Sequence, residues 1–399
     1  MADDDQHRRQ GFGTRLTHMG RAPLREHGFV NPPLVRGSTV LYPSCEERRA
    51  IGKRRMEQVL MYGTHGGPTH FALEDAIAEI EGGTRCQIYS TGLAAVAVPM
   101  LAFLSAGDHV LVPDSVYGPA RNLCDTMLKR FGVETTYYDP GLDEAGIAPL
   151  FRPNTRVLYT ESPGSHSFEM QDVPALARAA HARGAKVLMD NTWGIHHFQP
   201  FGHGVDVSIQ ALTKYAVGHS DVLLGSATVA NDADWETLRS GSTTLGQYAS
   251  PDDCWLALRG LRTLKVRIRE QEAAGLAVAR WFAAQPQVKQ VLHPALPGAP
   301  GHAIWKRDFT GAASLFGVVF QPTYTEADIF RMVDGLSLFG IGASWGGYES
   351  LALPTTNFIT RTATSGDLGG PAVRFHIGLE EVDDILADLA AGLARLDGR

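Results

Sequence analysis

Two residues of opposite charge stand at the ends of predicted strands. Lys214 follows Thr213 after the predicted strand 205–212, and Asp190 closes the earlier run 186–190. A lysine amine can bind the aldehyde of pyridoxal phosphate (PLP) as a Schiff base, and a carboxylate can keep the pyridine nitrogen protonated so that the ring accepts electrons. The pair therefore indicates a PLP site. Aspartate and lysine also end strands in ordinary α/β proteins, so the two residues alone leave a structural interpretation open.

A phosphate group could bind at a glycine turn upstream of this pair. Ser90-Thr91-Gly92-Leu93 leads directly into an apolar predicted helix, whose first backbone N–H groups could hold an anion. Thr213 could add a hydroxyl to the same phosphate. The alternative is an ordinary helix cap by serine or threonine, which is the commoner use of such residues.

Two further side chains have both a structural and a functional interpretation. Tyr117 follows a predicted strand and could stack on a pyridine ring, although an aromatic residue there is more often part of the core. Arg374 interrupts an apolar strand, where a charge is costly unless it is paired. Its partner could be a substrate carboxylate, bound through two parallel hydrogen bonds, or an acidic side chain of the protein in a structural salt bridge.

All of these residues except Arg374 fall within or directly beside a segment that alternates helices and strands. The predicted helices cover 71–80, 93–104, 119–131 and 174–184, and the predicted strands cover 109–113, 156–160, 186–191 and 205–212. Such alternation predicts an α/β fold with a mostly parallel sheet and helices on both faces. Ligands of such sheets bind beyond the carboxyl ends of the strands, where Asp190 and Lys214 are expected.

The chain divides into three predicted parts. Residues 1–62 are polar and weakly periodic, and we expect an extended arm that contacts a partner subunit. Residues 63–255 form the ligand-binding domain, and residues 256–399 form a smaller α+β domain. Its predicted strands cover 314–320 and 373–379, its helices cover 326–336 and 381–396, and a long helical stretch at 252–285 leads into it.

Composition argues against several other classes of protein. With 399 residues, of which 44% are hydrophobic and 20% charged, the chain is typical of a soluble protein with more than one domain. A net charge of -7 provides no basic surface for nucleic acid. Residues 1–9 are not a signal peptide, and the apolar run 93–104 is too short to span a bilayer, so we expect a cytoplasmic protein. No metal-binding, P-loop or dinucleotide motif is present.

Several ordered segments resemble the Cys/Met-metabolism PLP enzymes, the trans-sulfuration enzymes of aminotransferase fold type I. The resemblance extends from residue 14 to the final helix and is greatest to the bacterial cystathionine β-lyases. The segments that carry it are 161–164, 190–193, 210–215, 217–221, 258–264, 344–350 and 376–380. The resemblance implies a seven-stranded, mostly parallel sheet and the cofactor pyridoxal 5'-phosphate.

The resemblance also implies a role for each matching residue. Lys214 would bind the cofactor and act as general base, Asp190 would pair with the pyridinium, and Tyr117 would stack on the ring and supply a proton. Gly92, the amide of Leu93 and Thr213 would hold the phosphate, and Ser344, Trp345 and Arg374 would bind the substrate. Tyr62 would reach the cofactor and substrate of a neighbouring subunit, which implies at least a homodimer. Enzymes of the family usually assemble as a tetramer of two such dimers, so the resemblance also implies a homotetramer.

The activity that the resemblance implies is β-elimination from cystathionine or a related cysteine S-conjugate, with a thiol, pyruvate and ammonia as products. Chemistry at the γ-carbon, as in cystathionine γ-synthase, cystathionine γ-lyase and methionine γ-lyase, is an alternative because it uses the same cofactor residues. A PLP-binding regulatory protein without catalysis is another.

Two positions depart from the family pattern. Thr64 stands where an arginine usually clamps the neighbour's phosphate, so cofactor binding should be weaker unless His65 or another group substitutes. Ala343, which precedes Ser344, replaces a tyrosine of the related β-lyases and should widen the substrate pocket.

Overall fold

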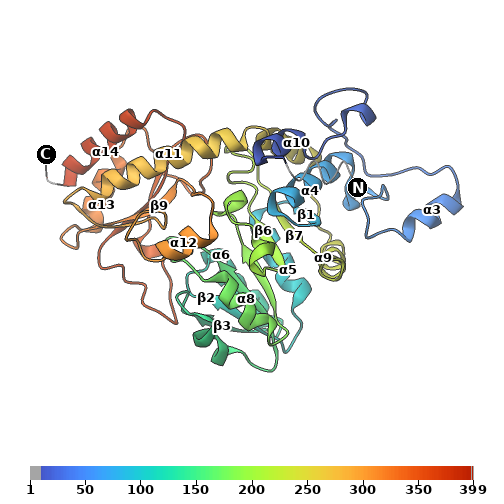
Figure 1. The fold of residues 1–399 in the computed structure, drawn as a ribbon, viewed down its shortest axis with the longest axis horizontal. Helices are drawn as coiled ribbons and strands as arrows, with labels where there is room; N and C mark the ends of the chain where they lie inside the picture. Colours follow the sequence, from blue (N-terminus) through green and yellow to red (C-terminus); the bar gives the residue numbers. More distant parts are fainter. Residues whose placement is uncertain (1–9, 397, 399) are drawn as a thin grey trace.

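The computed structural model describes residues 10–396 and 398. Residues 1–9, for which the sequence predicts no signal peptide, lie outside this range. Figure 1 shows two parts of unequal architecture, with the long helix α11 (Leu264–Ala283) running across the top of the smaller one toward the larger one. Among the described residues, no helix has the length and apolar character needed to cross a membrane.

The larger part contains a seven-stranded sheet, and the predicted fold class is confirmed. From one edge to the other the strands are β1 (Arg85–Tyr89), β7 (Gly225–Val229), β6 (Val207–Gln210), β5 (Lys186–Asp190), β4 (Thr155–Glu161), β2 (His109–Pro113) and β3 (Glu134–Tyr138). Only β7 runs antiparallel to its neighbours. The carboxyl ends of β2, β4, β5 and β6 therefore lie at one edge of the sheet.

Helices bury both faces of this sheet. They are α4 (Pro68–Glu81), α5 (Gly92–Phe103), α6 (Gly118–Leu123), α7 (Glu144–Ile147), α8 (Val173–His181) and α9 (Asp232–Thr244). Successive strand residues point to opposite faces, so Val110 and Val112 pack in one core while Leu111 packs in the other. Burial on both sides explains why these strands read as continuous apolar runs.

The smaller part contains a four-stranded antiparallel sheet. Its strand order is β10 (Leu351–Pro354), β11 (Ala372–His376), β9 (Leu315–Phe320) and β8 (Val288–Leu292). Helices α12 (His302–Asp308), α13 (Glu326–Asp334) and α14 (Val382–Leu396) complete this part. A separate core around Phe282, Phe316 and Phe375 joins the sheet to α11.

Two predicted elements differ from the structure. The helical stretch 252–285 is two helices, α10 (Pro251–Leu261) and α11, because the chain turns at Arg262–Thr263. The amino-terminal arm is not wholly extended, since it contains α2 (Phe12–His18) and α3 (Cys45–Gly52). Part of it packs on its own subunit: Leu16 is buried, and Arg262 donates a hydrogen bond of 2.9 Å to its carbonyl. The domain boundaries at 62 and 255 stay predictions.

Candidate active site

Lys214 and Asp190 come together at the carboxyl edge of the large sheet. Asp190 is the last residue of β5, and Lys214 lies in a turn that begins one residue after the adjacent parallel strand β6. The amine of Lys214 donates a hydrogen bond of 2.6 Å to the hydroxyl of Ser344, which comes from the smaller part. It also lies 5.6 Å from the centre of the Trp345 ring. The site therefore lies where the two parts meet.

The surroundings of Lys214 favour its neutral form. Burial and the positive charge of Arg374 lower the pKa of its amine to about 8, although Asp190 acts in the opposite direction. An amine with such a pKa is neutral in about one molecule in ten at pH 7 and in about half of the molecules at pH 8. It can therefore accept a proton, as a general base must.

Asp190 is held in place by the turn that follows it. Its Oδ1 accepts a hydrogen bond of 3.0 Å from the backbone N–H of Thr192, and the Thr192 hydroxyl accepts one of 2.8 Å from Ala211. Burial raises the pKa of Asp190, and the contacts with Thr192 act against that rise. The result is a fixed carboxylate at the sheet edge, as a pyridinium partner requires.

Glu161 lies beside Asp190 and has no role in the sequence-based predictions. The two residues are register partners on β4 and β5. Burial, followed by the charge of Asp190, raises the pKa of Glu161 well above its usual value. Its Oε2 accepts a hydrogen bond of 2.8 Å from the backbone N–H of Tyr117. Glu161 thus connects the strand of Asp190 to the turn that carries Tyr117.

The predicted phosphate end of the site lies where α5 begins. Thr91 caps this helix, its hydroxyl accepting a hydrogen bond of 3.1 Å from Ala94. A Cβ atom at Gly92 would lie 2.6 Å from the Cβ of Ala211, so glycine allows the helix to begin against the turn that carries Lys214. The free N–H groups of the first helical turn can bind a phosphate there. The hydroxyl of Thr213 already donates to the carbonyl of Leu224 at 3.1 Å, so its predicted phosphate contact would require that bond to be exchanged.

Arg374 enters the same site from β11. Its Nη2 donates a hydrogen bond of 3.0 Å to the carbonyl of Ser344, and burial lowers its pKa to about 10. Within the described part of the chain, no carboxylate forms an ion pair with it, which favours the substrate-carboxylate interpretation over a structural salt bridge. Ser344 has a φ of 79°, a strained left-handed conformation that is typical of functional sites.

Tyr117 and Tyr62 occupy different surroundings. Tyr117 precedes α6 and is 42% exposed, and burial together with Asp190 and Glu161 raises its pKa. Tyr62 is 52% exposed and forms an isolated bridge with Thr39 in the amino-terminal segment. No hydrogen bond or ring contact among the described residues joins Tyr62 to Lys214 of the same chain. Its predicted contact with a neighbouring subunit stays a prediction.

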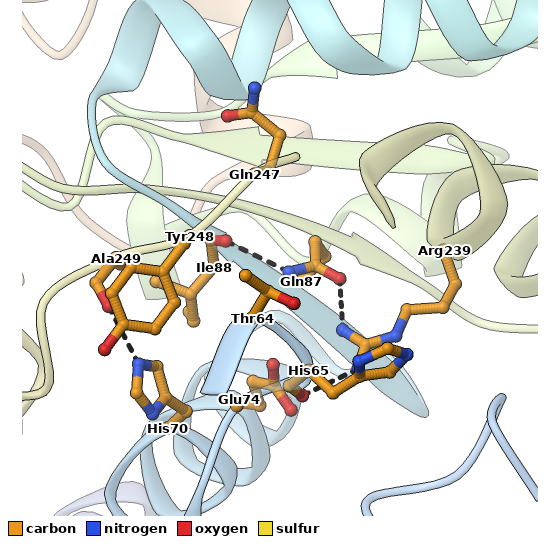
Figure 2. Close-up of a pocket in the computed structure, with 11 residues that line it drawn as sticks. Thr64, His65, His70, Glu74, Gln87, Ile88, Arg239, Gln247, Tyr248 and Ala249 are labelled. Carbon is orange, nitrogen blue, oxygen red and sulfur yellow. Dashed lines mark hydrogen bonds between the residues drawn. The ribbon is translucent and has the colours of Figure 1, made fainter. Parts of the chain in front are cut away.

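A polar pocket lies under the turn that follows Tyr62 (Figure 2). This turn, Gly63–His65, carries Thr64 and is tied down by Arg239 of α9, which donates hydrogen bonds to the carbonyl of His65 at 2.8 Å and to Gln87 at 2.6 Å. Burial and the charge of Arg239 lower the pKa of His65, so its ring is neutral at pH 7. His65 therefore does not replace the missing arginine charge, and the cation that contacts this turn is Arg239, through the carbonyl of His65 (Figure 2).

Sequence reasoning missed a contact between the two parts beside Tyr117. Asp114, the residue after β2, is fully buried and accepts hydrogen bonds from the backbone N–H groups of Thr362, Ala363 and Thr364 at 2.8–3.0 Å. It also pairs with Arg121 at 2.5 Å. An aspartate at a strand end can be recognised in a sequence as a candidate functional residue. The irregular loop that Asp114 binds has no sequence pattern that would identify it as the partner.

The chain is similar to known proteins of one enzyme family over nearly its whole length. Residues 13–394 match the family described as Cys/Met metabolism PLP-dependent enzyme. A Rhizobium johnstonii protein, provisionally named a cystathionine beta-lyase, is 48% identical over 96% of both chains. The cystathionine beta-lyase of Salmonella typhimurium is 43% identical over 96% of this chain and 98% of its own. Cystathionine gamma-lyase from Lactobacillus plantarum, solved with L-serine, aligns with a TM-score of 0.88 and 27% identity over 97% of this chain and 100% of its own.

Proposed function

Because the chain belongs to the Cys/Met metabolism PLP-dependent enzyme family, we propose that it is a carbon–sulfur β-lyase. Its substrate is L-cystathionine or a related cysteine S-conjugate, and the products are a thiol such as homocysteine, pyruvate and ammonia. The similarity to cystathionine beta-lyases supports this substrate. The observation with most weight in the structure is that the Lys214 amine bonds Ser344, whose carbonyl binds Arg374. A base and a carboxylate anchor are thus adjacent.

The residues at the sheet edge fit PLP. Lys214 would bind its aldehyde, Asp190 its pyridine nitrogen, and the first amides of α5, at Gly92 and Leu93, its phosphate. Tyr117 would cover one face of the ring. When bound, PLP withdraws electron density from the α-carbon of the substrate.

The remaining steps belong to the side chains of the protein. Arg374 and Ser344 hold the substrate carboxylate so that the α-proton faces the neutral amine of Lys214, which accepts it. The electron pair released at the α-carbon forms a new double bond to the β-carbon, and the carbon–sulfur bond breaks with its electrons leaving on sulfur. Lys214 or Tyr117 protonates the thiolate. Water then hydrolyses the enamine product to pyruvate and ammonia.

The proposal includes a cytoplasmic homo-oligomer with shared active sites. The half-exposed Tyr62 supports this arrangement, because its side chain makes no hydrogen bond or ring contact with any described residue of its own chain and is free to meet a neighbouring subunit. Thr64 lies on the same turn and would face the phosphate of the neighbouring subunit. A dimer is the smallest assembly that meets this requirement, and a tetramer of two dimers is the state we propose.

Elimination at the γ-carbon is the second candidate function. Ala343 favours it, because a small residue beside Ser344 leaves space for a substrate to bind in another orientation. The similar fold of a cystathionine gamma-lyase also supports it.

One assay separates these functions. The PLP-loaded protein is incubated with L-cystathionine, and the keto acid is identified by mass spectrometry, with Lys214→Ala as the inactive control. Pyruvate is the expected product. 2-Oxobutyrate would establish γ-elimination instead, and the absence of any keto acid from this and other cysteine thioethers would favour a PLP-binding protein without catalysis.

A further inference from the structure

Two loops from different parts of the molecule meet at a pair of aromatic rings. The first loop, 164–169, follows β4, and the second, 355–371, follows β10. The rings of His166 and Phe358 stack with their centres 5.8 Å apart and an angle of 22° between their planes. Phe358 is 55% exposed, so one side of the pair faces solvent.

Hydrogen bonds fix both loops in this position. Arg361, whose side chain is 4% exposed, donates to Ser167 at 2.5 Å and to Glu169 at 2.8 Å, and thus ties the second loop to the first. It also donates to the carbonyl of Asp114. The N–H of Ser165 donates a hydrogen bond of 2.9 Å to the carbonyl of Ser115.

Both loops are therefore attached to the turn that leads to Tyr117. In Figure 1 the second loop extends down from the smaller part toward the end of β2. His166 adopts a left-handed φ of 64°, which gives its ring a direction that few other residues could provide.

The aromatic pair lies on two loops that are fixed to the turn before Tyr117, the residue proposed to cover the PLP ring. Burial, then Arg374 and Arg361, lower the pKa of His166 to about 4, and Arg374 acts in the same way on Lys214 and interacts with Tyr117. His166 is therefore neutral, and Arg361 is paired with Glu169. The ring pair itself is thus uncharged, and the cation on the same loop, Arg361, is already paired.

We propose that His166 and Phe358 form an aromatic wall for the sulfur substituent of the substrate. The enzyme would then accept cysteine thioethers with a flat apolar substituent, such as S-benzyl-L-cysteine, in addition to cystathionine. A ring bound against this wall gains stacking and apolar contacts that a methyl group does not. The inference rests on the proposed β-lyase function and adds a substrate class to it.

The test compares two substrates that differ only in the substituent. kcat/KM for pyruvate formation is measured with S-benzyl-L-cysteine and S-methyl-L-cysteine in the wild type, Phe358→Leu and Phe358→Tyr. In Phe358→Leu the preference for the benzyl substrate should fall by about 2- to 10-fold, mainly through KM, because one aromatic contact is lost. Phe358→Tyr should retain the preference, since it keeps the ring.

Two further variants exclude a structural explanation. His166→Asn removes the second ring while asparagine tolerates the left-handed backbone, and it should lower the same preference. Phe330→Leu changes a half-exposed phenylalanine on α13 and should have no effect on it.

An equal loss for both substrates in Phe358→Leu, or no loss, would overturn the aromatic wall while leaving the β-lyase proposal intact. If the wild type forms pyruvate from neither compound, the β-lyase proposal fails for them. Calorimetric titration of the PLP-loaded protein then tests the wall independently, since S-benzyl-L-cysteine must still bind more tightly than S-methyl-L-cysteine in the wild type and lose that advantage in Phe358→Leu.

Discussion

At the residue scale, the proposed chemistry depends on the protonation of one amine. Lys214 has a pKa lowered to about 8 by burial and by Arg374, so its neutral fraction increases as the pH rises through this value. Only the neutral amine can accept the α-proton. The contact with Ser344 holds the same amine toward the substrate side of the site.

This predicts the shape of the pH profile. With saturating cystathionine, kcat should increase about tenfold per pH unit well below pH 8 and level off above about pH 9, because the general base becomes fully neutral. The measurement is the initial rate of pyruvate formation from pH 6 to 9.5. A profile that is flat across this range would mean that proton transfer to Lys214 does not limit turnover.

Single residues of the site were predictable where a polar side chain ends or interrupts an apolar run. Lys214, Asp190 and Arg374 all meet this condition, and the structure brings them to one edge. Glu161 also ends an apolar strand, but its contact with the backbone of Tyr117 depends on strand order. Sequence reasoning therefore had no basis for giving it a role.

At the scale of elements, the start of α5 is fitted closely to the turn that carries Lys214. Gly92→Ala places a Cβ atom 2.6 Å from Ala211, so the helix must move away from the phosphate position. We expect PLP to bind about tenfold more weakly, since the amides of the first turn lose their alignment. The measurement is a PLP titration of the apoenzyme followed by absorbance.

Gly202→Ala is the matched control for this substitution, because a Cβ atom there meets nothing within 4 Å. It should bind PLP as the wild type does. If Gly92→Ala also binds PLP normally, the phosphate does not lie at the start of α5.

The turn Gly63–His65 depends on α9 in a similar way. Arg239→Gln removes the hydrogen bond to the carbonyl of His65 and the nearby positive charge, so the turn that presents Tyr62 and Thr64 loses its anchor. We expect the affinity for PLP to fall about tenfold and KM to rise, with Arg239→Lys intermediate because it keeps the charge.

The control for this prediction is Arg269→Gln, which changes an exposed arginine on α11. A double variant, Arg239→Gln with Tyr62→Phe, should lose less activity than the two single effects combined, because both act on one turn. If the activity losses of the two single variants add fully, or if Arg239→Gln lowers the melting temperature without changing the affinity for PLP, Arg239 has only a structural role.

Elements were predictable where both faces of a strand are buried. Strands β2, β4 and β5 read as apolar runs for this reason, whereas β3 has a partly exposed surface at the sheet edge and was not identified. Strand β7, Gly225–Val229, is fully buried but consists mainly of small and hydroxyl residues. This strand is buried because it lies in close contact with the start of α5. A contact between two separate elements cannot be recognised from the residue pattern of the strand alone.

At the scale of the whole molecule, the substrate site exists only if the two parts keep their relative position. Lys214 and Tyr117 come from the larger part, and Ser344 and Arg374 from the smaller one. The contacts of Asp114 span 248–250 positions of sequence, and the loop that it binds has no periodic pattern. This part of the architecture could not be predicted from the chain alone.

Asp114 should therefore contribute measurably to stability. The N–H groups of Thr362, Ala363 and Thr364 and the guanidinium of Arg121 outweigh the effect of burial and lower its pKa to about 2. An unfolded aspartate has a pKa near 3.9, so the stabilisation is fully present above about pH 4 and is lost as the pH falls through about 2. Asp114→Asn should reduce the free energy of unfolding by about 2–4 kcal/mol at pH 7, because an amide cannot accept from all these donors.

Urea unfolding of the PLP-loaded enzyme measures this difference, with Asp367→Asn, an exposed aspartate of the same loop, as the control. At neutral pH the Asp114 variant should unfold at lower urea than the control, and the gap should narrow as the pH is lowered below 4. Its KM for cystathionine should also rise, because the loop that carries Arg361 is released from the turn before Tyr117. If stability falls while KM stays constant, Asp114 holds the two parts together but does not set the geometry of the substrate site.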